Sequence, residues 1–371
     1  MKILVTGGAG FVGSHLVDGL LEAGHDVRVL DNLYADVHGP DGKRPDHLSA
    51  GAELQVGDVR DPDAVRRALA GVEIVFHLAA IVGVGQSMYE IERYVSANSL
   101  GAAVLLEEIA ARPNRIRKML VASSMSIYGE GAYRNASGEV VHPGLRSEAD
   151  LAARRFELED ADGRPLQAIP TPEEKPLQPT SIYAVTKRDH EEMFLSVGAA
   201  YGIAAVALRY FNIYGTRQAL SNPYTGVVAI FSSRLLNRRR PMIFEDGLQS
   251  RDFVHVSDVV RANLLAMEAE AANGRVYNVG TGKPTSVLEI AALLAEELGV
   301  GEPPELVGRY RAGDIRHCYA DIRRIQGELG YHPAVDLADG IAELLDWLRG
   351  QTAVDQVDRA ARELEERGLA R

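Results

Sequence analysis

The chain of 371 residues contains one cysteine, Cys318, so it can form neither a disulfide within itself nor a cysteine-rich zinc site. We therefore expect a reducing compartment, the cytoplasm. Long apolar runs are missing as well, because no stretch approaches the roughly 20 apolar residues of a membrane span. The first residues, KILVTGG, already have a strand pattern and leave no room for a signal peptide. We expect neither export nor a membrane partner.

An excess of basic residues is also missing. The 40 Lys and Arg are outnumbered by 52 Asp and Glu, which gives a net charge of -12. Because nucleic acids bind to concentrated basic surfaces, we expect no nucleic-acid partner. The run Arg238, Arg239, Arg240 is an exception that is typical of a solvated helix end. Five histidines are scattered without the spacing of metal ligands, so we predict no metal site: His142, His190, His255, His317 and His332.

What the chain does have is an alternation of short apolar runs and longer helical patterns. A content of 46% hydrophobic and 25% charged residues fits a globular protein. The alternation predicts an α/β fold, a doubly wound parallel sheet with helices on both faces and a smaller C-terminal lobe. The expected strands are 2–7, 26–31, 52–58, 73–80, 117–124, 204–215 and 274–280, and the expected helices are 11–24, 64–71 and 181–202.

The first strand runs into the glycine-rich sequence TGGAGFVG, in which Gly8, Gly10 and Gly13 have the Gly-x-Gly-x-x-Gly spacing and Gly7 allows a more open variant. Between a strand and a helix, this motif permits a tight turn and a close approach of the backbone to a pyrophosphate. The pyrophosphate would lie over the N-terminus of the helix, where free N–H groups favour anions. The motif therefore predicts a dinucleotide site.

An acidic residue at the end of the second strand indicates which dinucleotide binds. Asp31 can accept hydrogen bonds from both ribose hydroxyls and would repel a 2′-phosphate, which favours NAD over NADP unless Arg28 or a loop arginine compensates. Asp58 follows the third strand and could reach the adenine edge or cap a helix, or do both.

Three further residues have the pattern of an acid–base site. Tyr183 and Lys187 lie four apart on an expected helix and so share a face. A nearby ammonium would lower the pKa of the tyrosine and make it usable as an acid or base. Ser124 ends an expected strand at the sheet edge where ligands bind in such folds. We predict that these residues are catalytic.

Together these motifs resemble those of the extended short-chain dehydrogenase/reductases, in particular the NAD-dependent nucleotide-sugar epimerases and dehydratases. The resemblance spans nearly the whole chain. The motifs in chain order are TGGAGFVG, DNL, HLAA, SSMSIYGEG, YAVTK, RYFNIYG, QSRDFVHVSD and GDIRHCYAD.

The resemblance implies a set of site residues. Tyr183 would be the acid/base, Lys187 would bind the ribose, and Ser124 would hydrogen-bond the reacting sugar. The implied NAD-binding residues are Gly7, Gly10, Phe11, Val12, Gly13, Asp31, Asn32, Asp58, Val59, Leu78, Ala79, Ala80, Asn98, Tyr183 and Lys187. The implied residues for a dTDP- or UDP-sugar are Ser124, Ser126, Asn212, Asn222, Phe244, Arg251, Arg311 and Cys318. Two separated arginines suit a diphosphate.

Within this family, sugar-nucleotide 4,6-dehydratases have Thr-Asp-Glu where this chain has Ser124, Met125 and Ser126. Without those carboxylates, elimination of water lacks its acid and base, so we expect an isomerase. Several stretches are most similar to the 4-epimerases of dTDP-L-rhamnose and UDP-glucose. Such an enzyme oxidises C4 of the sugar with bound NAD, turns the 4-keto intermediate and returns the hydride to its other face. Cys318 would border the sugar pocket, or would be an ordinary buried apolar residue.

Alternatives remain: a 4,6-dehydratase or decarboxylase on the same scaffold, or a non-catalytic dinucleotide-binding regulator. The set of Ser124, Tyr183 and Lys187 argues against the regulator. The helix that starts near Tyr183 and the one expected from about 89 to 111 resemble the pair that forms a four-helix dimer interface in the family. By that analogy we expect a homodimer.

These expectations divide the chain into an NAD-binding domain at 1–214, mainly a substrate-binding lobe at 215–350, and a C-terminal helix at 351–371. Some elements of the lobe should return to the first domain. An insertion at about 130–180 could be a lid or an interface. The terminal helix should pack on its own domain through one apolar side, formed by Val354, Val357, Ala361 and Leu364.

Overall fold

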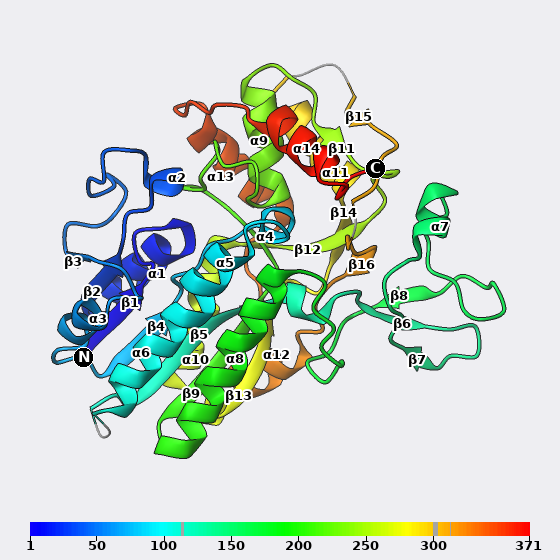
Figure 1. The fold of residues 1–371 in the computed structure, drawn as a ribbon. Helices are drawn as coiled ribbons and strands as arrows, with labels where there is room; N and C mark the ends of the chain where they lie inside the picture. The colour runs from blue at the N-terminus through cyan, green and yellow to red at the C-terminus, as the bar shows by residue number, and fades with distance from the viewer. Residues whose placement is uncertain (113–114, 300–302, 312) are drawn as a thin grey trace.

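A computed structural model describes residues 1–112, 115–299, 303–311 and 313–371. Its centre is a seven-stranded sheet in the order β13-β9-β5-β4-β1-β2-β3 (Figure 1). All neighbouring strands are parallel, which confirms the predicted doubly wound sheet. The strands are β1 (Lys2–Thr6), β2 (Asp26–Asp31), β3 (Glu53–Val56), β4 (Ile74–His77), β5 (Lys118–Ser124), β9 (Ala204–Tyr210) and β13 (Arg275–Val279).

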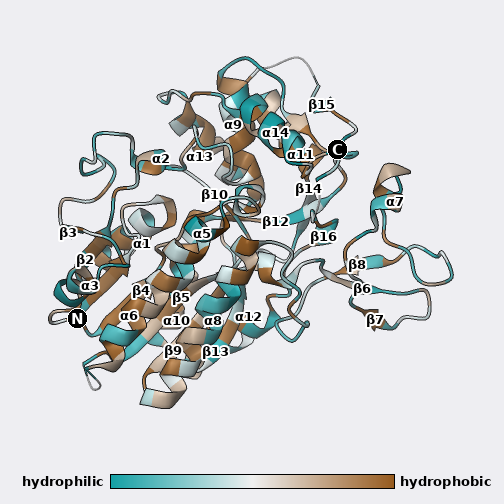
Figure 2. Cartoon of the chain, viewed as in Figure 1, coloured by the Kyte–Doolittle hydropathy of each residue, from teal (hydrophilic) through white to brown (hydrophobic). Residues whose placement is uncertain are grey.

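Helices cover both faces of this sheet, and together with it they form the Rossmann body. Apolar side chains of the strands alternate between two buried clusters, one on each face, and Figure 2 shows the apolar strands β4 and β5 between the helices. One cluster includes residues of α1 (Phe11–Glu22), α10 (Val256–Glu268) and α12 (Arg323–Leu329). The other includes residues of α3 (Pro62–Ala68), α6 (Gly101–Ala110) and α8 (Ile182–Tyr201).

The order of the strands fixes where a ligand binds. The chain leaves β1 toward β2 on one side and reaches β4 on the other, so the crossovers diverge between β1 and β4. Open α/β sheets bind ligands at such a point, beyond the carboxyl ends of the strands. Three short helices lie near this edge: α2 (Ala35–His38), α4 (Val84–Ser87) and α5 (Ile91–Tyr94).

The helix expected from about 89 to 111 is not uniform. Between α5 and α6, residues Val95–Leu100 form a π-helical segment. An extra residue in a helical turn shifts the side chains that follow and often occurs near functional sites. Here the segment contains the buried Asn98, whose Oδ1 accepts from Ile81 N at 2.8 Å and whose Nδ2 donates to Ile81 O at 3.1 Å.

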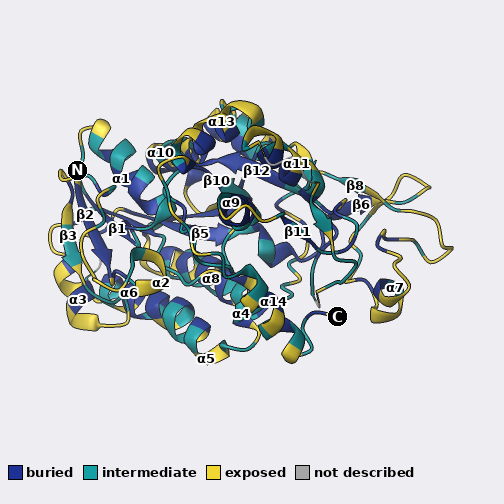
Figure 3. Cartoon of the chain, turned by 90° about the horizontal axis from the view of Figure 1, so that it is seen from above, coloured by how far each residue is buried: buried dark blue, intermediate teal, exposed yellow. Residues whose placement is uncertain are grey.

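The smaller lobe packs above the carboxyl edge of the sheet around its own apolar cluster. Seen from above, the buried strands lie in the middle and the exposed residues lie on the outer helices (Figure 3). The predicted return to the Rossmann body is made by α10, β13 and α12. The remaining elements of the lobe are β10 (Asn212–Tyr214), α9 (Val227–Leu236), β11 (Met242–Ile243), β12 (Ser250–His255), β14 (Pro284–Ser286), α11 (Val287–Glu297), β15 (Glu305–Leu306), β16 (His317–Cys318) and α13 (Leu337–Leu348).

The insertion projects to the side of the molecule as a small antiparallel sheet and one short helix (Figure 1). The elements are β6 (Ala132–Arg134), β7 (Val140–Val141), α7 (Glu148–Ala152) and β8 (Gln167–Ile169). It lies on the lobe as well as on the body, since Thr171 forms a parallel bridge with Ala320.

The C-terminal helix α14 (Val357–Glu366) begins later than the tail predicted at 351–371. Of the residues expected on its apolar side, Val354 precedes the helix and is exposed, whereas Ala361 and Leu364 are buried. Arg239, in the basic run at the end of α9, pairs with Asp358 at 2.9 Å and so ties this helix to the lobe. Among the helices in the described part of the chain, none has both the length and the hydropathy of a membrane span.

Candidate active site

A cavity of about 770 Å³ runs from the carboxyl edge of the sheet to the smaller lobe. At one end it meets the glycine-rich turn after β1, and at the other it meets the start of α9 and the strand end at Phe244. The cofactor residues predicted from the sequence that line it are Gly7, Gly10, Phe11, Val12, Gly13, Asp31, Asn32, Asp58, Val59, Leu78, Ala79, Ala80 and Tyr183.

The glycines of the turn are required for two different reasons. Gly7 has a φ of +69°, and a Cβ at Gly13 would overlap the carbonyl oxygen of Gly7, so the fold itself requires both. A Cβ at Gly10 would meet only Gly7 O, at 3.4 Å, and would otherwise extend into the space beside the cavity. Glycine at position 10 thus keeps open the space above the N-terminus of α1, where a pyrophosphate fits the free N–H groups.

Asp31 is held rigidly at the cavity wall. Its carboxylate accepts hydrogen bonds from the N–H groups of Ala9, at 3.0 Å, and Leu33, at 2.9 Å. These bonds use part of its accepting capacity and fix the carboxylate beside the turn. A fixed negative charge at this point suits ribose hydroxyls and opposes a 2′-phosphate.

Asp58 lies at the cavity wall, where Asn32 Nδ2 donates to it at 3.2 Å. Hydrogen bonds from the Arg60 side chain hold the pKa of Asp58 down at about 2. The alternative role as a helix cap is wrong: Asp61 caps α3, by accepting from Asp63 N at 2.9 Å. Asn98 lies behind the wall, and its amide also donates to Thr186 Oγ1 at 3.0 Å. It therefore supports the loop at Ile81 from behind.

Of the three predicted catalytic residues, Ser124 and Tyr183 line the cavity, whereas Lys187 is buried and is not among the described lining residues. Ser124 ends β5, and Tyr183 lies in the first turn of α8, which Ser181 caps by accepting from Ala184 N at 3.1 Å. Ser126 donates to Ser124 Oγ at 2.9 Å. Ser124, Ser126 and Tyr183 all line the cavity.

The pKa values of Tyr183 and Lys187 differ from the expectation. Burial raises the pKa of Tyr183 to about 12, although a hydrogen bond with Ser124 acts in the opposite direction. Lys187 Nζ donates to Ala122 O at 2.9 Å, and burial lowers the pKa of this lysine to about 7. The expected lowering of the tyrosine pKa by the ammonium is therefore absent, because desolvation dominates at both groups.

The predicted substrate residues line the other end of the same cavity: Asn212, Asn222, Phe244, Arg251 and Arg311. Asp314 Oδ2 accepts from Arg311 Nη2 at 2.7 Å, and Asp314 Oδ1 accepts from Arg251 Nη2 at 3.3 Å. The Arg311 guanidinium also lies 4.9 Å from the centre of the Phe244 ring. Asp314 lies in the GDIR motif, which we used only to locate Arg311, so its role in joining the two arginines was missed.

Cys318 is not at the pocket wall. It is 1% exposed, and its Sγ lies 3.7 Å from Thr171 Oγ1 of the insertion. The strand β16 turns this side chain toward the buried core, so the reading as an apolar buried cysteine is the correct one.

Helix α14 supplies cavity residues that the sequence analysis did not assign to the site: Val357, Ala360, Ala361, Leu364 and the nearby Leu369. The sequence showed that this helix has an apolar side, but it did not show that this side packs over the cavity. Tyr89 and Tyr224, from the Rossmann body and the lobe, both donate to Glu363 Oε2, at 3.2 and 2.8 Å. The helix therefore bridges both parts over the cavity.

Comparisons with known proteins agree with this geometry. The model of the NAD dependent epimerase/dehydratase family matches residues 3–148 and 160–280. The chain is 36% identical to a dTDP-L-rhamnose 4-epimerase of Burkholderia thailandensis, over 94% of each chain. The chain belongs to the NAD-dependent epimerase/dehydratase family.

Solved structures support the same assignment. A UDP-glucose 4-epimerase of Thermotoga maritima, solved with UDP-glucose, has a TM-score of 0.76 and 34% identity and covers 94% of this chain and 99% of its own. A UDP-glucose 4-epimerase of Thermus thermophilus, solved with NAD, has a TM-score of 0.74 and 32% identity and covers 95% and 100%. The cofactor of this family member is NAD, and the glycine turn, Asp31 and the free N-terminus of α1 are the residues that fit it.

Proposed function

We propose that this family member is an NAD-dependent 4-epimerase of a dTDP- or UDP-hexose. The observation that carries the proposal is the absence of an acid beside the catalytic tyrosine. Among the described residues that line the cavity, the carboxylates are Asp31, Asp36, Asp58 and Asp314, which lie at the cofactor end or beside the arginines. Met125 and Ser126 occupy the positions of the two dehydratase acids, so elimination of water lacks its acid and base. The similarity to named 4-epimerases supports the same choice.

In this mechanism Tyr183 exchanges the proton of the sugar's 4-hydroxyl, and Ser124 hydrogen-bonds the same oxygen. Lys187, buried beneath the site, contributes positive charge when it is protonated, which stabilises a tyrosinate. The glycine turn and Asp31 would hold NAD, which when bound would supply the hydride acceptor and donor for C4 of the sugar. The apolar wall formed by α14 keeps water away from the ketone while it turns.

The diphosphate of the substrate is proposed to bind between Arg251 and Arg311. Two guanidinium groups on separate segments can contact a diphosphate from both sides, and Asp314 keeps them on a common anchor. Asn212 and Asn222 add neutral hydrogen-bonding groups to the same wall. Phe244 offers a ring face near the nucleotide end.

The test is incubation of the purified protein with a panel of UDP- and dTDP-hexoses, followed by separation of stereoisomers and mass analysis. The proposal predicts a product of unchanged mass with inverted C4. Loss of water indicates the dehydratase, and binding without turnover indicates the regulator. Loss of carbon dioxide from a UDP-hexuronic acid added to the panel indicates the decarboxylase.

A homodimer is proposed for the assembled enzyme. Apolar side chains are exposed on α5, on the π-helical segment that follows it and on the neighbouring α8: Ile91, Val95, Leu100 and Val185. A solvent-exposed apolar helix face of this kind favours association with a second copy. Light scattering during size-exclusion chromatography should give twice the mass of one chain, and Leu100→Glu should reduce it. A single-chain mass for the unaltered protein would contradict the proposal.

A place in carbohydrate biosynthesis and in the cytoplasm is also proposed. A nucleotide-activated sugar is the form in which a sugar is passed to a transferase, so a 4-epimerase supplies a stereoisomer for transfer. The lone buried Cys318 fits a reducing compartment.

A further inference from the structure

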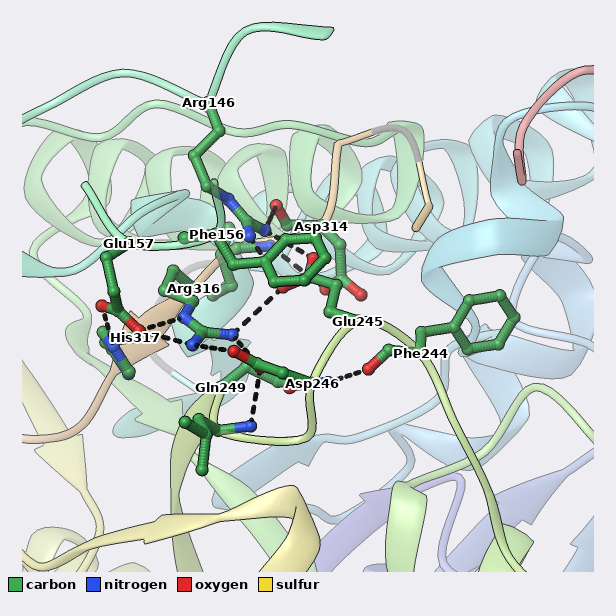
Figure 4. Close-up of polar contacts among 12 residues, drawn as sticks. Arg146, Phe156, Glu157, Phe244, Glu245, Asp246, Gln249, Asp314, Arg316 and His317 are labelled. Carbon is green, nitrogen blue, oxygen red and sulfur yellow. Dashed lines mark hydrogen bonds and ion pairs between the residues drawn. The ribbon is translucent and has the colours of Figure 1, made fainter. Parts of the chain in front are cut away.

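The insertion buries a charged side chain against the segment that carries Asp314. Arg146, just before α7, and Glu245, just after Phe244, each have 2% of their side chain exposed. The guanidinium makes a two-pronged contact, with Nη1 donating to Glu245 Oε2 at 2.7 Å and Nη2 to Glu245 Oε1 at 2.8 Å (Figure 4). Such paired hydrogen bonds fix both the position and the plane of the guanidinium.

The same guanidinium reaches the substrate end of the cavity. Arg146 Nη2 also donates to the carbonyl oxygen of Asp314 at 3.1 Å. The carboxylate of that aspartate accepts from Arg251 and Arg311. One residue of the insertion is therefore two contacts away from both arginines that line the cavity.

The side chain of Glu245, which Arg146 contacts, belongs to a backbone segment with an unusual conformation. Glu245 has a φ of +56°, a left-handed conformation that a side chain adopts at a cost. Arg316 Nη1 also donates to Glu245, at 3.2 Å, and to Asp246, at 2.7 Å. Glu245 thus lies between two guanidinium groups, and its neighbour Phe244 lies beneath Arg311.

Other contacts dock the insertion without Arg146. Glu130 accepts from the N–H groups of Arg316, at 2.7 Å, and His317, at 2.8 Å. Thr171 pairs with the backbone of Tyr319 and Asp321. These contacts remain when Arg146 is replaced, so the docking of the insertion and the effect of Arg146 on Asp314 can be tested separately.

We infer that Arg146 is a positioning residue, which acts through Asp314 and Glu245 to hold Arg251 and Arg311 in the arrangement that binds the substrate diphosphate. This inference rests on the proposed function. Arg146 then contributes to the affinity for the nucleotide sugar without lining the cavity itself. Because Arg146 contacts Asp314 and Glu245 but neither Ser124 nor Tyr183, its loss should weaken binding and leave the chemical step intact.

The test compares Arg146→Met and Arg146→Lys with the unaltered NAD-loaded enzyme. The methionine has a similar length but no donor, whereas the lysine keeps the charge and loses the planar fork. Glu157→Gln is the matched control, because Glu157 belongs to the same insertion and pairs with Arg316 but has no contact with Asp314. The readouts are KM and kcat, the Kd of UDP and dTDP by calorimetry, bound NAD and the midpoint of thermal unfolding.

For Arg146→Met we expect KM and the nucleotide Kd to rise about tenfold or more, with kcat within about twofold and NAD retained. Arg146→Lys should lie between it and the unaltered enzyme, and Glu157→Gln should change neither KM nor Kd. A lower midpoint with unchanged KM and Kd in Arg146→Lys would overturn the inference, even if the methionine variant failed to fold. If the unaltered protein bound neither nucleotide, the proposed function would fail first, before the role of Arg146 was tested.

Discussion

At the scale of single residues, burial sets the pKa values of the two titrating catalytic groups. Lys187 is 4% exposed, with one hydrogen bond to a carbonyl, whereas Tyr183 is partly buried and lines the cavity. Burial opposes charge on both side chains: it raises the pKa of Tyr183 to about 12 and lowers that of Lys187 to about 7. A proton can then pass between Tyr183 and a sugar hydroxyl without a large reorganisation of solvent.

Tyr183→Phe removes the proton carrier and keeps the ring. We expect kcat for epimerisation to fall about a thousandfold, since general acid–base groups contribute at about this level. NAD binding and the unfolding midpoint should change little. Tyr201→Phe, at the exposed end of the same helix, is the control and should keep full activity. An active Tyr183→Phe enzyme would remove Tyr183 from the mechanism.

Lys187→Met should alter stability in a way that depends on pH. The lysine pKa is lowered from 10.5 to about 7 in the folded chain, so between these values the unfolded chain binds more protons. The charged Lys187 therefore lowers the free energy of unfolding of the unaltered protein most below about pH 7. This destabilisation decreases as pH rises from about 7 to 10.5.

The free energy of unfolding of Lys187→Met minus that of the unaltered protein, both without NAD, should therefore be larger near neutral pH than at about pH 10. Thermal unfolding of both proteins at the two pH values measures the difference. Since all other titrating groups are shared, an equal difference at both pH values would show that the lysine is not held neutral by burial.

At the scale of elements, regular segments could be predicted from the sequence and short ones could not. Strands β1, β2 and β5 and helices α1 and α8 lie within the predicted ranges, because each repeats its apolar pattern over several residues. The strands of the insertion are only two or three residues long, too short for a period to show. The π-helical turn at Val95–Leu100 is set by tertiary contacts of Asn98, which local propensity does not contain.

Helix α14 provides a prediction at this scale. Ala361 is buried and lines the cavity, so Ala361→Leu should narrow it and raise KM about tenfold with an unchanged NAD content. Arg362→Leu, the neighbouring exposed position, is the control. Steady-state kinetics on the substrate that the panel identifies would measure both, and equal KM values for the two variants would mean that α14 does not limit the substrate space.

At the scale of the whole molecule, the site is assembled from segments that are distant in the chain. The glycine turn, Ser124 and Tyr183 could be assigned to the cavity from their residue types and spacing, and Arg251 from the family resemblance. The sequence left two roles open for Cys318, and Asp314 and α14 were missed, because packing between distant segments decides which side chain faces the cavity. The proposed domain boundaries at 214 and 350 stay a prediction.

The central claim is that the enzyme inverts C4 by removing and returning a hydride at that carbon. The most direct measurement uses the UDP- or dTDP-hexose that the panel identifies, labelled with deuterium at C4, in ordinary water. The account predicts a C4 epimer that keeps its deuterium at C4 and gains none of the solvent's hydrogen at carbon. Deuterium lost to solvent, deuterium moved to another carbon with loss of water, or no epimer would contradict it.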